Sequence, residues 1–202
     1  MASTLQSLAE RIAGCRLCAD QFAATETAHQ PRPVVRPSST ARILIAGQAP
    51  GARVHKSGLP FDDPSGDRLR DWLGVDRATF YDTSRLSIVP MAFCFPGYDA
   101  RGSDLPPPKR CAETWRSDLL AAMGQVELTL LVGQYAQAWH MGRARKASLT
   151  ETVRHWQEYG PKLLPLPHPS WRNTGWLKRN PWFEAEVLPW LRARVADLLA
   201  PA

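Results

Sequence analysis

The chain has no long hydrophobic run. None of its apolar stretches approaches the ~20 consecutive residues needed to span a bilayer. Its N-terminus also lacks the basic-then-apolar layout of a secretory signal. These absences argue against a membrane partner, and we expect a cytoplasmic protein.

Acidic residues and cysteines are both in short supply. Asp and Glu number 19 against 25 Lys and Arg, which leaves a net charge of +6. A basic balance suits a polyanion such as nucleic acid, although an ordinary basic protein shows the same excess. There are only four cysteines. In a cytosolic chain they favour metal or cluster ligation over structural disulfides.

What is present is an alternation of strand and helix patterns along 202 residues, a length that suits one domain. Helical spacing and turn signals predict helices over 4–14, 67–73 (with Ser65 as a candidate cap), 111–123, 135–141, 150–159 and 182–199. Apolar runs predict strands over 42–46, 86–91, 127–132 and 162–166, with loops over 48–66 and 95–109. This order predicts an α/β fold, a three-layer αβα sandwich with a central four-stranded, mostly parallel sheet. We expect residues 1–202 to form a single domain.

Two short segments follow predicted strands directly. G-Q-A-P-G, residues 47–51, comes after the run at 43–46, and H-P-S-W-R-N, residues 168–173, comes after 163–166. Loops at the carboxyl ends of parallel strands converge on one crevice, where ligands bind. Gln48 and His168 are therefore expected to face one pocket.

Four features taken together carry a family resemblance. They are G-Q-A-P-G, the segment G-L-P-F-D-D-P-S-G at 58–66, the four cysteines, and H-P-S at 168–170. In this order and spacing the chain resembles the uracil-DNA glycosylase superfamily, most closely its iron–sulfur branches, families four and five. The resemblance implies a DNA repair enzyme that excises uracil from DNA by cleaving the N-glycosidic bond. It also implies a monomer.

Such a reaction needs defined chemical groups. The base must be flipped into a pocket that offers a stacking face, donors for the departing base, and a group that orients water. We expect His168 to be the donor and Gln48, with the backbone of its loop, to hold the base or the water. Asp63 matches the Asp of a similar family-five segment and is the expected water-orienting group. Asp62 is the alternative, and a helix cap or turn former is the competing role for Asp63.

Base binding follows from the resemblance, with two departures. Phe61 occupies the position of the family's stacking Phe, and Gly47 and Ala49 belong to the loop around the base. Ala49 stands where the best-known branch has its water-activating Asp. Pro90 stands where the iron–sulfur branches carry an Asn that reads uracil.

These departures leave the reading of the base open. Candidates for that role are Gln48, Gln134, Asn173 or backbone amides around Phe93, and excision of hypoxanthine, xanthine or other deaminated bases stays possible. Neither motif contains a Lys at the sugar, so we expect an abasic product without a strand break. The extra basic loop of the covalent uracil-trapping branch is absent, which disfavours trapping.

The stretch after His168 is basic and aromatic. Ser170, Trp171, Arg172 and Lys178 are the expected DNA contacts, because cations interleaved with Trp suit phosphate gripping and wedging into a duplex. The alternative is a solvated basic face around a buried Trp.

The cysteines form a C-x-x-C pair, Cys15 and Cys18, and a more widely spaced pair, Cys94 and Cys111. Four thiolates suit either a [4Fe–4S] cluster or zinc, and spacing does not separate the two. The resemblance implies the cluster, while four unligated buried thiols are the alternative. Two rival functions remain: a non-catalytic protein that binds damaged or abasic DNA, motivated by Ala49 and Pro90, and a metal or redox protein.

Overall fold

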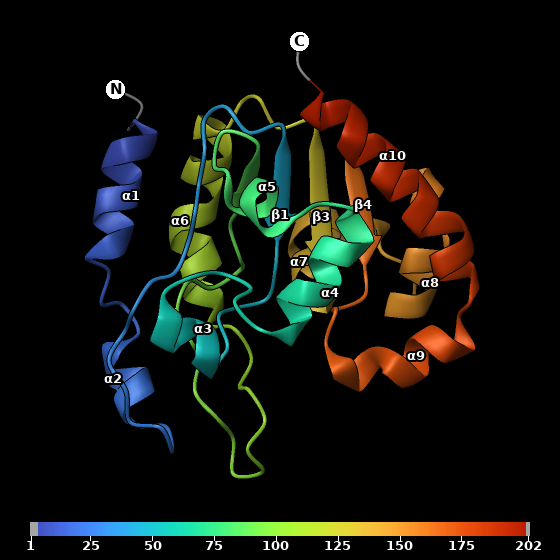
Figure 1. The fold of residues 1–202 in the computed structure, drawn as a ribbon. Coiled ribbons are helices and arrows are strands. Elements are labelled where there is room, and N and C mark those ends of the chain that lie inside the picture. Colours follow the sequence, from blue (N-terminus) through green and yellow to red (C-terminus); the bar gives the residue numbers. More distant parts are fainter. Residues whose placement is uncertain (1–3, 201–202) are drawn as a thin grey trace.

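Four parallel strands form the centre of the protein (Figure 1). The computed structural model describes residues 4–200. Its strands are β1 (Ile43–Ala46), β2 (Leu86–Ile88), β3 (Leu128–Val132) and β4 (Leu163–Leu166), in the order β2-β1-β3-β4. Nearly every strand residue is buried, as expected for a parallel sheet covered on both faces. The predicted α/β fold with a four-stranded parallel sheet is confirmed.

Helices connect and cover the strands. They are α1 (Leu5–Ala13), α2 (Ala19–Ala23), α3 (Ala52–Ser57), α4 (Pro64–Leu73), α5 (Arg77–Tyr81), α6 (Lys109–Ala122), α7 (Gln134–Met141), α8 (Leu149–Arg154), α9 (Thr174–Arg179) and α10 (Leu188–Leu199). In residues 4–200 no helix is both long and apolar enough to cross a membrane.

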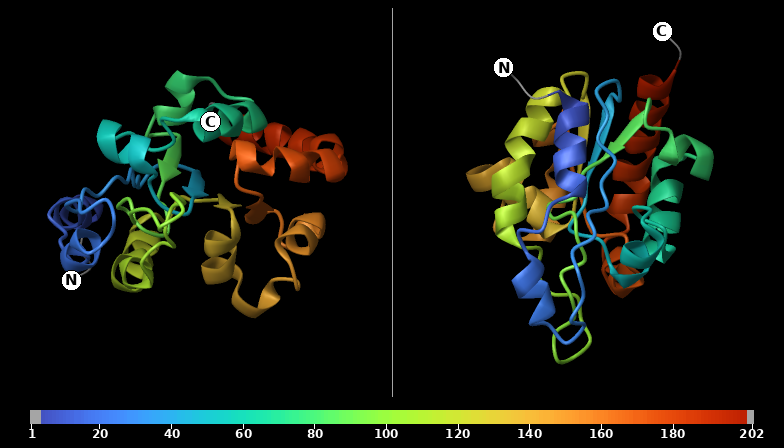
Figure 2. Two further views of the ribbon diagram at one scale, coloured as in Figure 1. Left: turned by 90° about the horizontal axis from the view of Figure 1, so that it is seen from below. Right: turned by 90° about the vertical axis from the view of Figure 1, so that its left-hand side faces the viewer.

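The helices lie in two layers, one on each side of the sheet (Figure 2). On one side α1 and α6 pack over Leu44 and Val89, and α7 covers Leu131. On the other side α4, α8 and α10 bury the larger core, which includes Ile43 and Ile45 of β1. Alternate residues of β1 therefore serve opposite cores.

Strand β4 lies at one edge of the sheet and contains Pro165. The carbonyls of Lys162 and Leu166 accept hydrogen bonds from amides of β3 and of Gly133, which follows it. The backbone N–H and C=O groups of residues 163 and 165 therefore point away from β3, toward the free edge of the sheet. The amide of Leu163 donates to the Tyr159 carbonyl at 3.3 Å, and Pro165 has no amide hydrogen. Proline is tolerated here because this side has no partner strand.

The structure corrects three local predictions. The predicted loop 48–66 contains helix α3. Helix α4 begins at Pro64 with Asp63, not Ser65, as its N-cap. The predicted helix 182–199 opens as a wide π turn over Phe183–Val187 before α10, because Pro189 cannot donate the usual backbone hydrogen bond.

Candidate active site

The loops after β1 and β4 meet at the carboxyl edge of the sheet. Gly47 follows β1 and His168 follows β4, although β3 lies between these strands. Gly133 follows β3 and lies beside His168: a Cβ placed there would be 3.7 Å from the Cβ of His168, an ordinary contact, so the φ of +84° and not lack of space favours glycine here. The expected convergence of the two motifs on one pocket is present.

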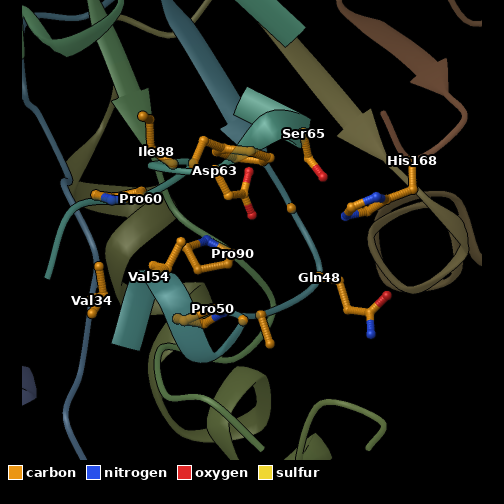
Figure 3. A pocket seen from close by; sticks show the side chains of 14 residues that line it. Val34, Gln48, Pro50, Val54, Pro60, Asp63, Ser65, Ile88, Pro90 and His168 are labelled. Carbon is orange, nitrogen blue, oxygen red and sulfur yellow. The ribbon is translucent and has the colours of Figure 1, made fainter. Parts of the chain in front are cut away.

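The pocket combines a polar side with an apolar inner wall (Figure 3). Gln48, Asp63, Ser65 and His168 supply its polar side chains. The Asp63 carboxylate and the His168 ring both point into the space between them (Figure 3). The remaining lining residues are Val34, Gly47, Ala49, Pro50, Gly51, Val54, Pro60, Phe61, Ile88 and Pro90.

His168 is held as a donor by its own loop. The amide of Ser170 donates to Nδ1 of His168 at 3.2 Å, so in the neutral ring the proton lies on Nε2. The side-chain amide of Asn173 donates to the His168 carbonyl at 2.7 Å. Burial lowers the pKa of His168, and nearby Asp63 opposes this only in part. The imidazole is therefore neutral at pH 7, with Nε2–H free to donate.

The Asp63 carboxylate both caps helix α4 and lines the pocket. One oxygen, Oδ1, accepts the amide of Gly66 at 2.9 Å and caps α4, as the competing interpretation of this residue required. The same carboxylate lines the pocket. Asp62 is instead paired with Arg77 at 2.9 Å, and that hydrogen bond lowers the pKa of Asp62. Of the two candidates, Asp63 is the one in the pocket.

Phe61 is held in a strained backbone conformation, with φ +55°. Its ring lies against Gly47, where a Cβ would come within 3.2 Å of Cζ. A Cβ on Gly66 would overlap the Phe61 carbonyl oxygen, so the turn requires glycine there. Tyr81 donates from its hydroxyl to the carbonyl of neighbouring Pro60 at 2.9 Å. The aromatic face is thus fixed from several sides.

Three of the expected base-binding residues do not line the pocket. The Phe93 side chain is buried among Leu8 and Ile12, and its carbonyl accepts the Val34 amide at 2.6 Å. Gln134 is exposed at the start of α7. Asn173 lies farther out, where its amide is occupied by the His168 carbonyl. Gln48 and Ala49 lie in the pocket as expected.

An open groove of about 600 Å³ adjoins the pocket and shares Gln48, Asp63 and His168 with it. Trp171 is 70% exposed beside it, with the Arg172 guanidinium 5.7 Å from its ring centroid. The groove residues outside the pocket are Ala52, Arg53, Pro64, Tyr98, Gly102, Ser103, Asp104, Ser170, Trp171, Arg172 and Asn173. Lys178 on α9 is exposed but does not line the groove.

The four cysteines line one small cavity. They share it with prolines and aromatic residues, and the full lining is Cys15, Leu17, Cys18, Pro31, Pro33, Ala92, Phe93, Cys94, Pro108, Cys111 and Trp115. Burial raises the pKa of both Cys94 and Cys111 to about 12, and the other thiols add to it. Backbone hydrogen bonds from Arg32 to Cys94 and from Phe93 to Cys111 act in the opposite direction.

Within residues 4–200, no three His, Cys, Asp or Glu side chains form a group that could hold a metal ion. The thiols therefore surround a common space without converging on a single-ion site. Such an arrangement is compatible with a ligand larger than one ion, because each iron of a [4Fe–4S] cluster takes its own thiolate.

Comparison with known protein families identifies the family of this chain. A family model described as the Uracil DNA glycosylase superfamily matches residues 34–192, most of the chain. The chain belongs to this superfamily. As a uracil-DNA-glycosylase-superfamily protein it has the fold of a DNA repair hydrolase that acts on DNA. The matched region includes both motif loops, Cys94 and Cys111, but not Cys15 and Cys18.

Sequence reasoning missed three residues of this superfamily site. Gly133 was recognisable only as a glycine after a strand. Arg68 on α4 donates to the Ser170 carbonyl at 2.9 Å, a contact made across the groove. Asp104 lies in the groove with its Oδ2 3.9 Å from the Cβ position of Gly51. Burial raises the pKa of Asp104, Arg172 opposes that shift, and Asp63 adds to it. Nothing in the local sequence around Asp104 distinguishes it from other loop aspartates.

Proposed function

We propose that this protein is a monofunctional DNA glycosylase that removes uracil, or a closely related deaminated base, and leaves an abasic site. The observation that carries the proposal is the pocket itself. It brings together an aromatic ring, Phe61, and a neutral imidazole donor, His168, beside a groove with exposed cations. A flipped base entering from the groove would meet the Phe61 ring and the His168 Nε2–H.

His168 would act on the leaving group. As the bond between C1′ and the base nitrogen breaks, its electron pair passes to the base, and negative charge develops on the base oxygens. A donor fixed before the reaction stabilises that charge without reorganisation. The neutral form is suited to this task because its hydrogen bond strengthens as the oxygen becomes anionic.

Asp63 would act on the sugar side. Its carboxylate, held in place as the N-cap of α4, would stabilise the cationic sugar and orient a water whose oxygen forms the new bond to C1′. The water's proton would pass to the carboxylate or to the departing base anion, which completes the hydrolysis. Ala49 has no polar atom for this role, and Asp62 is paired with Arg77. No lysine lines the pocket, which agrees with water as the nucleophile.

The identity of the base is the less specified part of the proposal. The inner wall is apolar, formed by Val34, Ile88 and Pro90 among others, and polar recognition is confined to the mouth and the 47–51 backbone. This wall favours, as a second candidate, an enzyme with a broader range of deaminated bases. A damage-binding protein without catalysis is a third outcome of the same experiment.

The test is base release from a panel of oligonucleotides carrying uracil, hypoxanthine or xanthine, followed by alkali, with an abasic oligonucleotide included to measure binding alone. We expect release of uracil and no strand break before alkali. His168→Ala should slow release about ten- to a thousand-fold. His155→Ala is the matched control, because His155 is exposed at the C-terminal end of α8 and lines neither the pocket nor the groove. Tight binding without release of any base would support the non-catalytic alternative.

We further propose that Cys15, Cys18, Cys94 and Cys111 hold a [4Fe–4S] cluster. When bound, the cluster would supply a cross-link between the segment after α1, the segment after β2 and the first turn of α6. Iron and sulfide analysis of the purified protein, with a visible absorption band, tests it, and Cys94→Ala should abolish both. One bound zinc per chain, or four freely titrating thiols, would contradict the cluster. A monomeric, cytoplasmic enzyme stays our prediction, and sedimentation tests the first part.

A further inference from the structure

A buried arginine lies behind the pocket wall. Arg116 on α6 is 1% exposed. Its Nη1 donates to the carbonyls of Val89 at 3.0 Å and Pro90 at 3.1 Å. Its Nε and Nη2 donate to Nε2 of His140 at 3.1 and 2.7 Å, and its guanidinium lies 5.3 Å from the Trp139 ring centroid.

This charge has no carboxylate partner in residues 4–200, where the ion pairs all involve other cations. Burial lowers the pKa of Arg116 only to about 10, so it stays charged at neutral pH. Burial and Arg116 together lower the pKa of His140 to about 3, which makes the imidazole a neutral acceptor. A buried charge is costly to keep, and Arg116 is compensated by its bonds to two carbonyls and an imidazole and by nearby Cys111, which acts to raise its pKa.

The segment that Arg116 holds also holds the catalytic loop. This segment consists of residues 89–92. The amide of Met91 donates to the Gly47 carbonyl at 2.9 Å, and the amide of Ala92 donates to the Gln48 carbonyl at 3.1 Å. Pro90, whose carbonyl Arg116 binds, turns its ring into the pocket (Figure 3). Residues 89–92 are therefore hydrogen-bonded to Arg116 through two carbonyls and to Gly47 and Gln48 through two amides.

We propose that Arg116 is a positioning residue for base release: by fixing the carbonyls of Val89 and Pro90, it sets the pocket wall and the Gln48 loop at the distance that the reaction requires. The proposal rests on the proposed glycosylase function. Proline at position 90 offers no side-chain polar atom to the base, so this wall is placed by the packing of Val89 and Met91 and by hydrogen bonds to the backbone of the segment. The guanidinium is the group that can bind two successive carbonyls and an imidazole at once.

The experiment compares Arg116→Met, which keeps the length but removes the charge and donors, with Arg116→Lys, which keeps a cationic donor. Arg154→Met is the matched control, because Arg154 also lies over a tryptophan, Trp182 at 5.1 Å, but on the exposed surface of α8. Single-turnover release and the half-saturating DNA concentration are measured for each variant. Amide hydrogen exchange is followed for a peptide spanning 88–95.

We expect Arg116→Met to slow release about ten- to a hundred-fold at an unchanged half-saturating concentration, as a small misplacement of reacting groups does. Arg116→Lys should keep part of the rate, Arg154→Met all of it, and exchange at Met91 and Ala92 should quicken only in the Arg116 variants. Should Arg116→Met not fold, Arg116→Lys and His140→Leu carry the comparison.

Each other outcome has one meaning. Lower thermal stability with an unchanged release rate per folded molecule overturns the proposal, and so does slow release with unchanged exchange at Met91 and Ala92. If the unmodified protein releases no base from the whole panel, the proposed function fails first. The exchange comparison then still decides whether Arg116 holds the segment.

Discussion

His168 owes its donor geometry to neighbours within five residues of it. The Ser170 amide fixes the ring nitrogen that accepts, and Asn173 fixes the carbonyl of the same residue. Both contacts come from the short turn that follows the strand, so the sequence H-P-S-W-R-N carries the orientation as well as the imidazole. Partial burial then sets its protonation state.

The first prediction concerns pH. The neutral form of His168 is the donor, and its pKa lies below the ordinary 6.5. Base release should therefore stay level at and above pH 7 and fall only as the pH drops through the lowered pKa. Single-turnover rates between pH 4.5 and 8.5 measure this. An acid limb centred above 6.5 would contradict the burial argument, and His168→Gln should remove the limb.

The second prediction concerns Gly66. An added Cβ would overlap the carbonyl oxygen and carbon of Phe61, which are backbone atoms and cannot move aside as a flexible side chain would. Gly66→Ala should lower the melting temperature and slow base release by displacing the stacking ring. Gly124→Ala is the control, because nothing lies within 4 Å of a Cβ at that turn. Equal behaviour of the two variants would show that the turn relaxes freely.

At the scale of elements, helix α4 connects the parts of the site. Its N-cap, Asp63, lines the pocket, and Arg68 in its second turn bonds to the Ser170 carbonyl across the groove. Arg70, a buried residue of the same helix, has its guanidinium 5.2 Å from the ring centroid of Phe80, and the Phe80 ring contacts the Phe61 ring edge to face. One short helix therefore connects the loop that carries Phe61 to the loop that carries His168.

The third prediction separates the two roles of Asp63. Asn caps helices about as well as Asp, whereas Ala does not, at a cost of about 1 kcal/mol. Asp63→Asn should keep the melting temperature but lose at least tenfold in base release, since the negative charge is gone. Asp63→Ala should lose both. If Asp63→Asn releases base at the normal rate, the residue serves as a cap alone.

At the scale of the whole molecule, the excess of positive charge bears on DNA binding. Arg53 and Arg172 line the groove, whereas Arg143 is exposed on a turn after α7. Removing a phosphate contact should lower the slope of log affinity against log salt by about one. The salt slope therefore distinguishes cations that contact DNA in the groove from cations that only add to the net charge of +6.

The fourth prediction follows from that difference. Arg172→Ala and Arg53→Ala should each weaken binding to uracil-containing duplex and reduce the salt slope. Arg143→Ala changes the net charge equally and should leave the slope unchanged. Titrations by fluorescence anisotropy between 50 and 300 mM salt, about the range where counterion release dominates, measure both. Equal effects of all three variants would show that the groove is not the binding face.

Sequence patterns sufficed for the sheet because each strand is a short run of mainly apolar residues, interrupted only by Ser87 in β2 and Thr129 in β3. They missed α2, α3, α5 and α9, which have five or six residues and too few turns to show a helical period. The convergence of Gln48 and His168 was predictable from their positions after strands. The burial of Arg116 was not, because it depends on how α6 and α7 pack against the end of β2.

The proline in β4 has a consequence for how the protein behaves in a crowded solution. Exposed sheet edges invite a strand from another molecule, which is a route to aggregation. On this edge one outward amide is already taken by Tyr159, and the next position, Pro165, has none to give. Pro165 is also buried, so this part of the edge is covered as well as lacking a donor, and both features protect it from pairing with another molecule. Replacing Pro165 with valine would leave a buried amide hydrogen without a strand partner.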